Sequence, residues 1–145
     1  MRRTIIAVVM VCLTAACGGN GPTGPSSSIP NVVGTYSGNV TITFPELTAQ
    51  VNCPSSTSVT QSGATVSIAP LVLRGECGSQ SIPLGQVEID ATGSIGSESG
   101  TFNDPSCGNY TYSASGGFFG RELRLSMTAT SPTCYNFNFT ATLTK

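Results

Sequence analysis

The sequence has no histidine and no tryptophan, and only 9% of its residues are charged. Without histidine, the Ser-His and Cys-His pairs that activate a nucleophile cannot form, and a metal site cannot use imidazole ligands. The only lysine is Lys145, so a serine has no internal lysine as its base. We therefore expect a protein that is not an enzyme, with no catalytic residues, no metal and no cofactor.

Positive charge is also scarce. Arg2 and Arg3 stand at the extreme N-terminus, and the remaining cations are Arg74, Arg121, Arg124 and Lys145. Four scattered cations cannot form the basic stripe that neutralises phosphates, which argues against a nucleic-acid partner. Anionic membrane surfaces are poor electrostatic partners for the same reason.

The first sixteen residues have the profile of an export signal. Two arginines give a positive start, an apolar run follows over residues 4–13, and small residues occupy positions 14–16. The apolar run is too short to span a bilayer, and this order of segments is typical of signal peptides. A buried N-terminal helix is the alternative, but residues 5–13 offer it no polar face. We predict that residues 1–16 are cleaved.

Residues 13–17, Leu-Thr-Ala-Ala-Cys, resemble the lipobox of bacterial lipoproteins. In that family a small pair precedes a cysteine, which is lipidated through its thiol and becomes the N-terminus after cleavage. This sequence departs from the pattern at Thr14, where the family favours leucine. The resemblance implies a cleaved lipoprotein signal and a lipid on Cys17 that anchors the protein in a membrane. The alternative for Cys17 is a disulfide, while Cys12 is a poorer lipidation candidate because large residues precede it.

A Gly-, Pro- and Ser-rich segment follows Cys17. Residues 18–28 contain no large apolar side chain to bury, so we expect residues 17–30 to form a lipidated, flexible tether. Gly18 is not the Asp that the lipoprotein resemblance associates with retention in the inner membrane. We expect a lipid-anchored protein of the cell envelope, at the outer membrane where the cell has two.

From residue 31 onward the apolar pattern has a period of two. Apolar and polar residues alternate over residues 36–44, 122–128 and 135–144, as in strands with one buried face, and Ser62-Gly63 marks a hairpin turn. We predict one all-β domain over residues 31–145, a single antiparallel meander that closes, or nearly closes, into an up-and-down barrel of about eight strands. A two-sheet β-sandwich is the alternative.

Gly34-Thr35-Tyr36 is similar to the Gly-x-Trp opening of lipocalins, with Tyr in place of Trp. An eight-stranded barrel is near the size at which side chains either fill the interior or leave room for one small ligand. The strand alternation points five aromatic residues inward as candidate ligand-lining residues, with ordinary core packing as the alternative. They are Tyr36, Phe44, Tyr135, Phe137 and Phe139.

Two functions follow as hypotheses. The first is an envelope-anchored lipoprotein whose non-catalytic barrel binds a small apolar or amphiphilic ligand. The second is a structural or surface-display protein, with no internal ligand, that touches other envelope proteins or glycans through its Thr- and Asn-rich outer face. An open internal cavity favours the first hypothesis, and a filled interior favours the second.

Four cysteines remain in the domain, and an even number in an exported protein indicates two disulfides. A zinc site is disfavoured because there is no Cys-x-x-Cys pair. If the strands on either side of a turn at residues 116–120 form a hairpin, their register brings Cys107 close to Cys134. Cys53 then pairs with Cys77, with a bulge near Gly75 to absorb the offset.

Two acidic segments could suggest chemistry. Glu88 and Asp90 are the best-placed pair of carboxylates, but alternation puts them on a solvated outer face. The oxygen-rich segment 103–109 suggests calcium, yet its Asp-Pro-Ser sequence is ordinary turn chemistry. We interpret both as structural.

Overall fold

A computed structural model describes residues 28–145 of the chain. The predicted signal peptide, Cys17 and most of the predicted tether lie outside the described residues. The residues on either side of the predicted domain boundary at residue 31 both contact the domain. Val32 is buried in the core, and the Pro30 carbonyl accepts a hydrogen bond of 3.0 Å from the Gln61 side chain.

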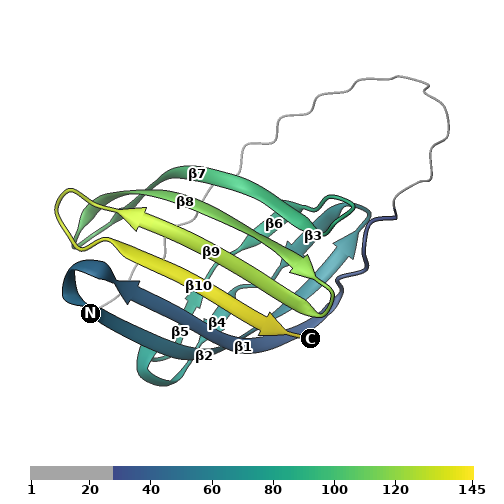
Figure 1. The fold of residues 1–145 in the computed structure, drawn as a ribbon, viewed down its shortest axis with the longest axis horizontal. Helices are drawn as coiled ribbons and strands as arrows, with labels where there is room; N and C mark the ends of the chain where they lie inside the picture. The colour runs from purple at the N-terminus through teal and green to yellow at the C-terminus, as the bar shows by residue number, and fades with distance from the viewer. Residues whose placement is uncertain (1–27) are drawn as a thin grey trace.

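Ten strands and two short 3-10 helices make up the domain (Figure 1). The strands are β1 (Gly34–Phe44), β2 (Ala49–Ser62), β3 (Thr65–Ile68), β4 (Leu71–Leu73), β5 (Gln80–Ile82), β6 (Gly85–Glu88), β7 (Ser94–Asp104), β8 (Gly108–Phe119), β9 (Glu122–Thr130) and β10 (Phe137–Thr144). The 3-10 helices are η1 (Pro45–Leu47) and η2 (Gly75–Cys77). Among the described residues no helix is long and apolar enough to cross a membrane.

All ten strands belong to one antiparallel sheet. Its main path runs β5-β4-β2-β1-β10-β9-β8-β7, so the first and last strands pair with each other near the middle. The sheet curls through 227°, which carries β3–β6 behind β8, β9 and β10 (Figure 1). The predicted all-β, single-sheet, barrel-like fold is confirmed, in the form of a half-barrel.

The ten strands form a sheet of eight strand positions, because β3 with β4, and β6 with β5, each make up one interrupted strand. β3 and β4 follow one another along β2, and β6 and β5 pair with them in a single register, from Thr65↔Glu88 to Leu73↔Gln80. Continuing that register places Pro70 opposite Pro83. Neither proline has an N–H to donate to the ladder, so the pairing breaks between Ile68 and Leu71. The underlying order is the predicted eight-stranded meander.

The two edges of the curled sheet meet at only one end. An isolated bridge pairs Ile89, just after β6, with Ile95 in β7, and the Asp90 N–H donates to the Ser94 carbonyl at 3.1 Å. Beyond this bridge β7 pairs only with β8, and the register between them shifts between Ile95 and Glu98. The two edges of the half-barrel are therefore joined at this end, which we call the bridged end. They are apart at the other end, beside the β7–β8 loop, which we call the open end.

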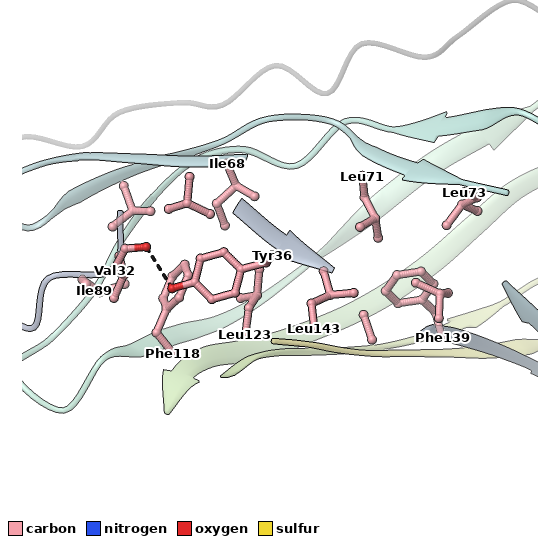
Figure 2. Close-up of a cluster of buried hydrophobic side chains, with 14 of the residues drawn as sticks. Val32, Tyr36, Ile68, Leu71, Leu73, Ile89, Phe118, Leu123, Phe139 and Leu143 are labelled. Atoms are coloured by element: carbon pink, nitrogen blue, oxygen red, sulfur yellow. Dashed lines mark hydrogen bonds between the residues drawn. The ribbon is translucent and has the colours of Figure 1, made fainter. Parts of the chain in front are cut away.

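A tightly packed hydrophobic core fills the half-barrel at its bridged end. Tyr36, Leu71, Leu123 and Leu143 have no exposed surface, and they come from strands on both sides of the curl (Figure 2). The Tyr36 hydroxyl donates a hydrogen bond of 2.9 Å to the Val32 carbonyl, and the ring packs edge-on against Phe118 at 5.7 Å between centroids.

The turn predicted at residues 116–120 lies further along the chain. β8 continues through Phe119, and the turn is formed by Gly120, with φ +64°, and Arg121. Gly116 is instead a point of close approach, because a Cβ there would lie 2.6 Å from the Arg124 carbonyl oxygen and 2.8 Å from the Leu125 side chain. Gly116 therefore allows β8 and β9 to pack closely rather than reversing the chain.

Candidate functional site

The five aromatic residues predicted to line a ligand site lie in three different environments. Tyr36 is fully buried and Phe139 is 5% exposed, both within the hydrophobic core. Phe44 and Phe137 are half-buried near the open end of the half-barrel. Tyr135 is 53% exposed. The structure therefore brings only Phe44 and Phe137 together, with ring centroids 6.3 Å apart.

Tyr36 and Phe139 are placed to stabilise the fold. A side chain with no accessible surface has no room beside it for even a water molecule, so a ligand cannot touch Tyr36 while the core is intact. Phe139 packs in the same cluster. These two rings have the packing role that the sequence left open as the alternative.

Tyr135 does not point inward as its alternation with Phe137 predicts. β10 begins only at Phe137, so Tyr135 belongs to the loop after β9, where a strand period does not apply. Its backbone carbonyl accepts a hydrogen bond of 3.2 Å from the Tyr110 hydroxyl. Tyr135 therefore contacts Tyr110 through its backbone carbonyl, while the residue itself is half-exposed to solvent.

A continuous series of five aromatic rings crosses the inner face at the open end. Phe44 contacts Phe137, Phe137 meets Tyr110 edge-on at 5.6 Å, and Tyr110 stacks on Phe102 at 5.0 Å with 9° between the ring planes. Phe102 also contacts Tyr112 at 6.1 Å. We call these residues, Phe44, Phe102, Tyr110, Tyr112 and Phe137, the inner aromatic strip.

The register fixes this strip on the inner face. Tyr112 pairs with Ala129, and Ala129 pairs with Phe137, which shares its face of β10 with the core residue Phe139. Tyr110 is 7% exposed, whereas the other four rings are half-buried. The strip is therefore an apolar surface that the fold leaves partly uncovered.

Three members of the strip, Phe102, Tyr110 and Tyr112, were not predicted as site residues. A signal for them exists in the sequence, because the turn residues Asp104-Pro105-Ser106 separate Phe102 from Tyr110. A hairpin about this turn pairs Phe102 with Tyr110, as observed. The contacts with Phe137 and Phe44 depend on strands distant in the sequence and have no local signal.

Negative charge surrounds the tyrosines of the strip. The Tyr112 hydroxyl donates to Glu98 at 3.2 Å, and burial, followed by the charge and hydrogen bond of Glu98, raises the pKa of Tyr112. Burial also raises the pKa of Tyr110, with smaller contributions from the charges of Asp104 and Glu46. Both phenols therefore keep their protons at physiological pH, where Tyr112 donates to Glu98 and Tyr110 donates to the Tyr135 carbonyl.

Of the acidic residues singled out in the sequence, Glu88 ends β6, whereas Asp90 and Asp104 organise turns. Asp90 Oδ1 accepts hydrogen bonds from the Thr92 hydroxyl and from the backbone N–H groups of Thr92 and Ser94, and these bonds lower its pKa. Asp104 Oδ1 accepts from the N–H groups of Ser106 and Cys107. Within residues 28–145 no cluster of three acidic, Cys or His side chains could hold a metal ion.

Both predicted disulfide pairs are present. Cys53 and Cys77 have Cα atoms 5.8 Å apart, and η2 accommodates the offset expected near Gly75, which has φ +68°. Cys107 and Cys134 have Cα atoms 5.4 Å apart. Extending the β8–β9 register past Thr111↔Thr130 places these two cysteines opposite each other. This second bridge ties the β7–β8 loop to the β9–β10 loop beside the inner aromatic strip.

Two open depressions lie elsewhere on the molecule, and no strip residue lines either one. One, of about 530 Å³, is bounded by residues of β7–β10, and the other, of about 520 Å³, lies beside the proline break at Ala69-Pro70. Comparisons of the chain with protein families, curated proteins and solved structures find no match. Function therefore has to be inferred from the geometry of these surfaces.

Proposed function

We propose that this protein is an envelope-anchored lipoprotein whose half-barrel binds an amphiphilic ligand on the inner aromatic strip without transforming it. The observation that carries the proposal is the unbroken series of ring contacts from Phe44 to Tyr112, across strands β1, β10, β8 and β7. Aromatic rings that remain half-buried in a folded protein offer apolar contact area to a ligand.

The strip supplies polar contacts along its length. The Tyr112 hydroxyl and the Glu98 carboxylate meet at its β7 end, and Glu46 lies near the opposite end, where its carboxylate accepts hydrogen bonds from the backbone and side chain of Asn136. An apolar surface bordered by a few hydrogen-bonding groups suits a ligand with one apolar and one polar part. The ligand class is therefore an amphiphile rather than a pure hydrocarbon.

The charges near the strip favour a neutral, zwitterionic or cationic headgroup. Three acidic residues, Glu46, Glu98 and Asp104, lie near the aromatic residues, and their charges contribute to the raised pKa of Tyr110 and Tyr112. Arg121 and Arg124 are engaged elsewhere, with the Lys145 carbonyl and with Glu122 respectively. An anionic headgroup would therefore meet repulsion without a compensating partner at the strip.

Lipid anchoring at Cys17 is supported by the cysteines of the domain. Cys53, Cys77, Cys107 and Cys134 pair among themselves, so Cys17 is not needed to complete a disulfide. Two disulfides also suit an oxidising compartment outside the cytoplasm. Together with the lipobox-like residues 13–17, this pairing favours Cys17 as the lipidated residue.

The ligand proposal is tested with two lysophospholipids that have the same acyl chain. The chain from residue 18 to the C-terminus, which contains every strand of the sheet, is titrated with lysophosphatidylcholine and lysophosphatidylglycerol, with displacement of a fluorescent naphthylamine probe as the signal. We expect the zwitterionic lipid to bind more tightly. Phe102→Ala should weaken its binding about tenfold, because a stacked ring is lost.

The matched control is Phe119→Ala, which removes a half-exposed ring from the outer face. It should leave binding of lysophosphatidylcholine unchanged. The proposal is wrong if neither lipid displaces the probe, or if both alanine variants bind as the wild type does.

The anchor is tested by growing the producing cells with an alkyne-tagged palmitate. We expect the wild-type chain to incorporate the label and Cys17→Ser to lose it and accumulate as a precursor. Finding a free thiol or a disulfide at Cys17 in the wild type by mass spectrometry would exclude lipidation.

A display role without a ligand is the second candidate, because core side chains fill the bridged end of the half-barrel. The fully buried Tyr36, Leu123 and Leu143 leave no cavity there. This candidate predicts that substitutions in the inner aromatic strip change stability but no binding activity. The lysophospholipid titration separates the two candidates directly.

A further inference from the structure

The open depression bounded by residues of β7–β10 lies on the outer face of the sheet, opposite the core. Leu123 is buried, so the alternation along β9 points Arg124 and Ser126 outward. Both residues bound the depression, together with Phe119 at the end of β8. Its volume of about 530 Å³ is within the range of small-ligand sites. None of its residues belongs to the inner aromatic strip, so the two surfaces are independent.

Phe119 provides an exposed aromatic platform at one end of this depression. Phe119 is 49% exposed, so part of its ring is open to contact from solvent. A Cβ on Gly117 would lie 2.9 Å from the Phe119 Cζ and 3.1 Å from its Cε2, so the glycine makes space for this edge of the ring against the sheet. The Arg124 guanidinium lies 5.6 Å from the ring centroid and helps to hold its orientation.

The charges at the depression compensate one another. Glu122 accepts hydrogen bonds from Arg124 Nε at 2.8 Å and from Nη2 at 2.5 Å. The pair presents fixed donors and acceptors with no net charge. A phosphate or an acidic sugar would have to compete with Glu122 for the guanidinium, which disfavours anionic ligands.

Hydroxyl groups from adjacent strands form the rest of the floor. Ser115, Ser126 and Thr140 lie side by side across β8, β9 and β10, because the register pairs Ser115 with Ser126 and Ser126 with Thr140. All three bound the depression. Neighbouring strands are about 4.8 Å apart, so the hydroxyls form a row with that spacing.

We propose that this depression is a binding site for a neutral saccharide. The apolar C–H face of a pyranose ring can stack on the face of Phe119 that Arg124 does not cover, while its hydroxyl groups bond to the Arg124–Glu122 pair and to the row of Ser and Thr hydroxyls. Each feature fits this ligand for a different physical reason: the platform fits the ring face, the balanced pair fits the lack of charge, and the row fits repeated hydroxyl groups. The occupant is therefore a glycan rather than a lipid or a nucleotide.

Affinity electrophoresis of the full chain tests the proposal. Native gels contain dextran, amylopectin or laminarin as neutral polysaccharides, or alginate as the acidic control, and a polyoxyethylene detergent keeps the chain soluble without adding a sugar headgroup. We expect at least one neutral polysaccharide to retard the wild type and alginate not to. Phe119→Ala should weaken this retardation about tenfold, and Phe119→Tyr should retain it.

Tyr135→Ala is the matched control, since it removes another exposed ring that does not line the depression. Thr140→Val provides a second variant with nearly unchanged shape, and we expect it to weaken retardation severalfold even if Phe119→Ala fails to fold. Phe102→Ala, in the inner aromatic strip, should bind polysaccharide normally, which separates this site from the proposed amphiphile site. The proposal is overturned if no neutral polysaccharide retards the wild type, if alginate retards it most, or if Phe119→Ala and Thr140→Val both migrate as the wild type.

Discussion

Tyr36 combines a large buried ring with a single polar contact. Its hydroxyl donates to the Val32 carbonyl, which joins the segment before β1 to the core. Tyr36→Phe removes the donor and leaves a buried carbonyl without that partner, so we expect a loss of about 1–2 kcal/mol in the free energy of unfolding. Urea denaturation measures it. Tyr135→Phe, at an exposed ring, should change the midpoint little, and equal effects of the two variants would contradict this interpretation.

The tyrosines also give stability a dependence on alkaline pH. Burial is the largest cause of the raised pKa of Tyr36, Tyr110 and Tyr112 in the folded protein. The folded state holds these protons more tightly than the unfolded chain does. Their contribution is therefore fully present below about pH 10 and is lost as the pH rises through the raised values.

We expect the urea midpoint to fall steeply above about pH 10, in parallel with tyrosinate absorbance. The urea midpoint of Tyr36→Phe should fall less steeply, because this variant lacks one group whose pKa differs between the folded and unfolded states. An identical pH profile for wild type and Tyr36→Phe would show that Tyr36 does not contribute.

At the scale of elements, β1 depends on a glycine at its closest contact with β10. A Cβ on Gly38 would overlap the Thr142 carbonyl oxygen and the Leu143 Cα, both backbone atoms that cannot move aside. We expect Gly38→Ala to lower the free energy of unfolding by about 1–3 kcal/mol through overpacking. Gly96→Ala is the control, because no atom lies within 4 Å of its Cβ position. Thermal melts compare the two variants, and similar midpoints would show that β1 and β10 can separate without cost.

Local patterns predicted several elements well. The alternation in β1, β9 and β10 and the turn signal at Ser62-Gly63 appear in the structure as strands and a hairpin. A hairpin of β8 and β9 was sufficient to bring Cys107 near Cys134, although its turn lies later in the chain than predicted, because a hairpin depends only on residues close in the sequence.

Other features depend on contacts that no local pattern encodes. The inner aromatic strip requires β10 to lie beside β1, which joins Phe137 to Phe44. The open edge of β7 depends on the total curl of the sheet, and the interruption in β3–β6 depends on two prolines meeting across a register. Period-two alternation therefore predicts which face of a strand is buried but not how far that burial extends along it, as Tyr135 illustrates.

At the scale of the whole molecule, the disulfides restrain an open sheet. Cys53–Cys77 and Cys107–Cys134 close loops of 24 and 27 residues, so each should contribute about 3 kcal/mol by limiting the unfolded chain. We expect Cys107→Ala together with Cys134→Ala to lower the free energy of unfolding by about this amount. Guanidinium denaturation measures it, and non-reducing peptide mapping checks the pairing in the wild type. Recovery of Cys53 linked to Cys107 or Cys134 would contradict the meander.

The pairing of β1 with β10 also dictates when the molecule can fold. The partners, such as Ser37 and Thr144, are about a hundred residues apart, and they lie near the middle of the sheet. In a chain that is synthesised from its N-terminus, β1 can pair with β2 early. The other edge of β1 stays unpaired until β10 has been released. Contacts of such long sequence separation form slowly. The chain is therefore expected to stay incompletely folded until Phe137–Thr144 emerges, and release of that final segment becomes the event that commits it to its native state.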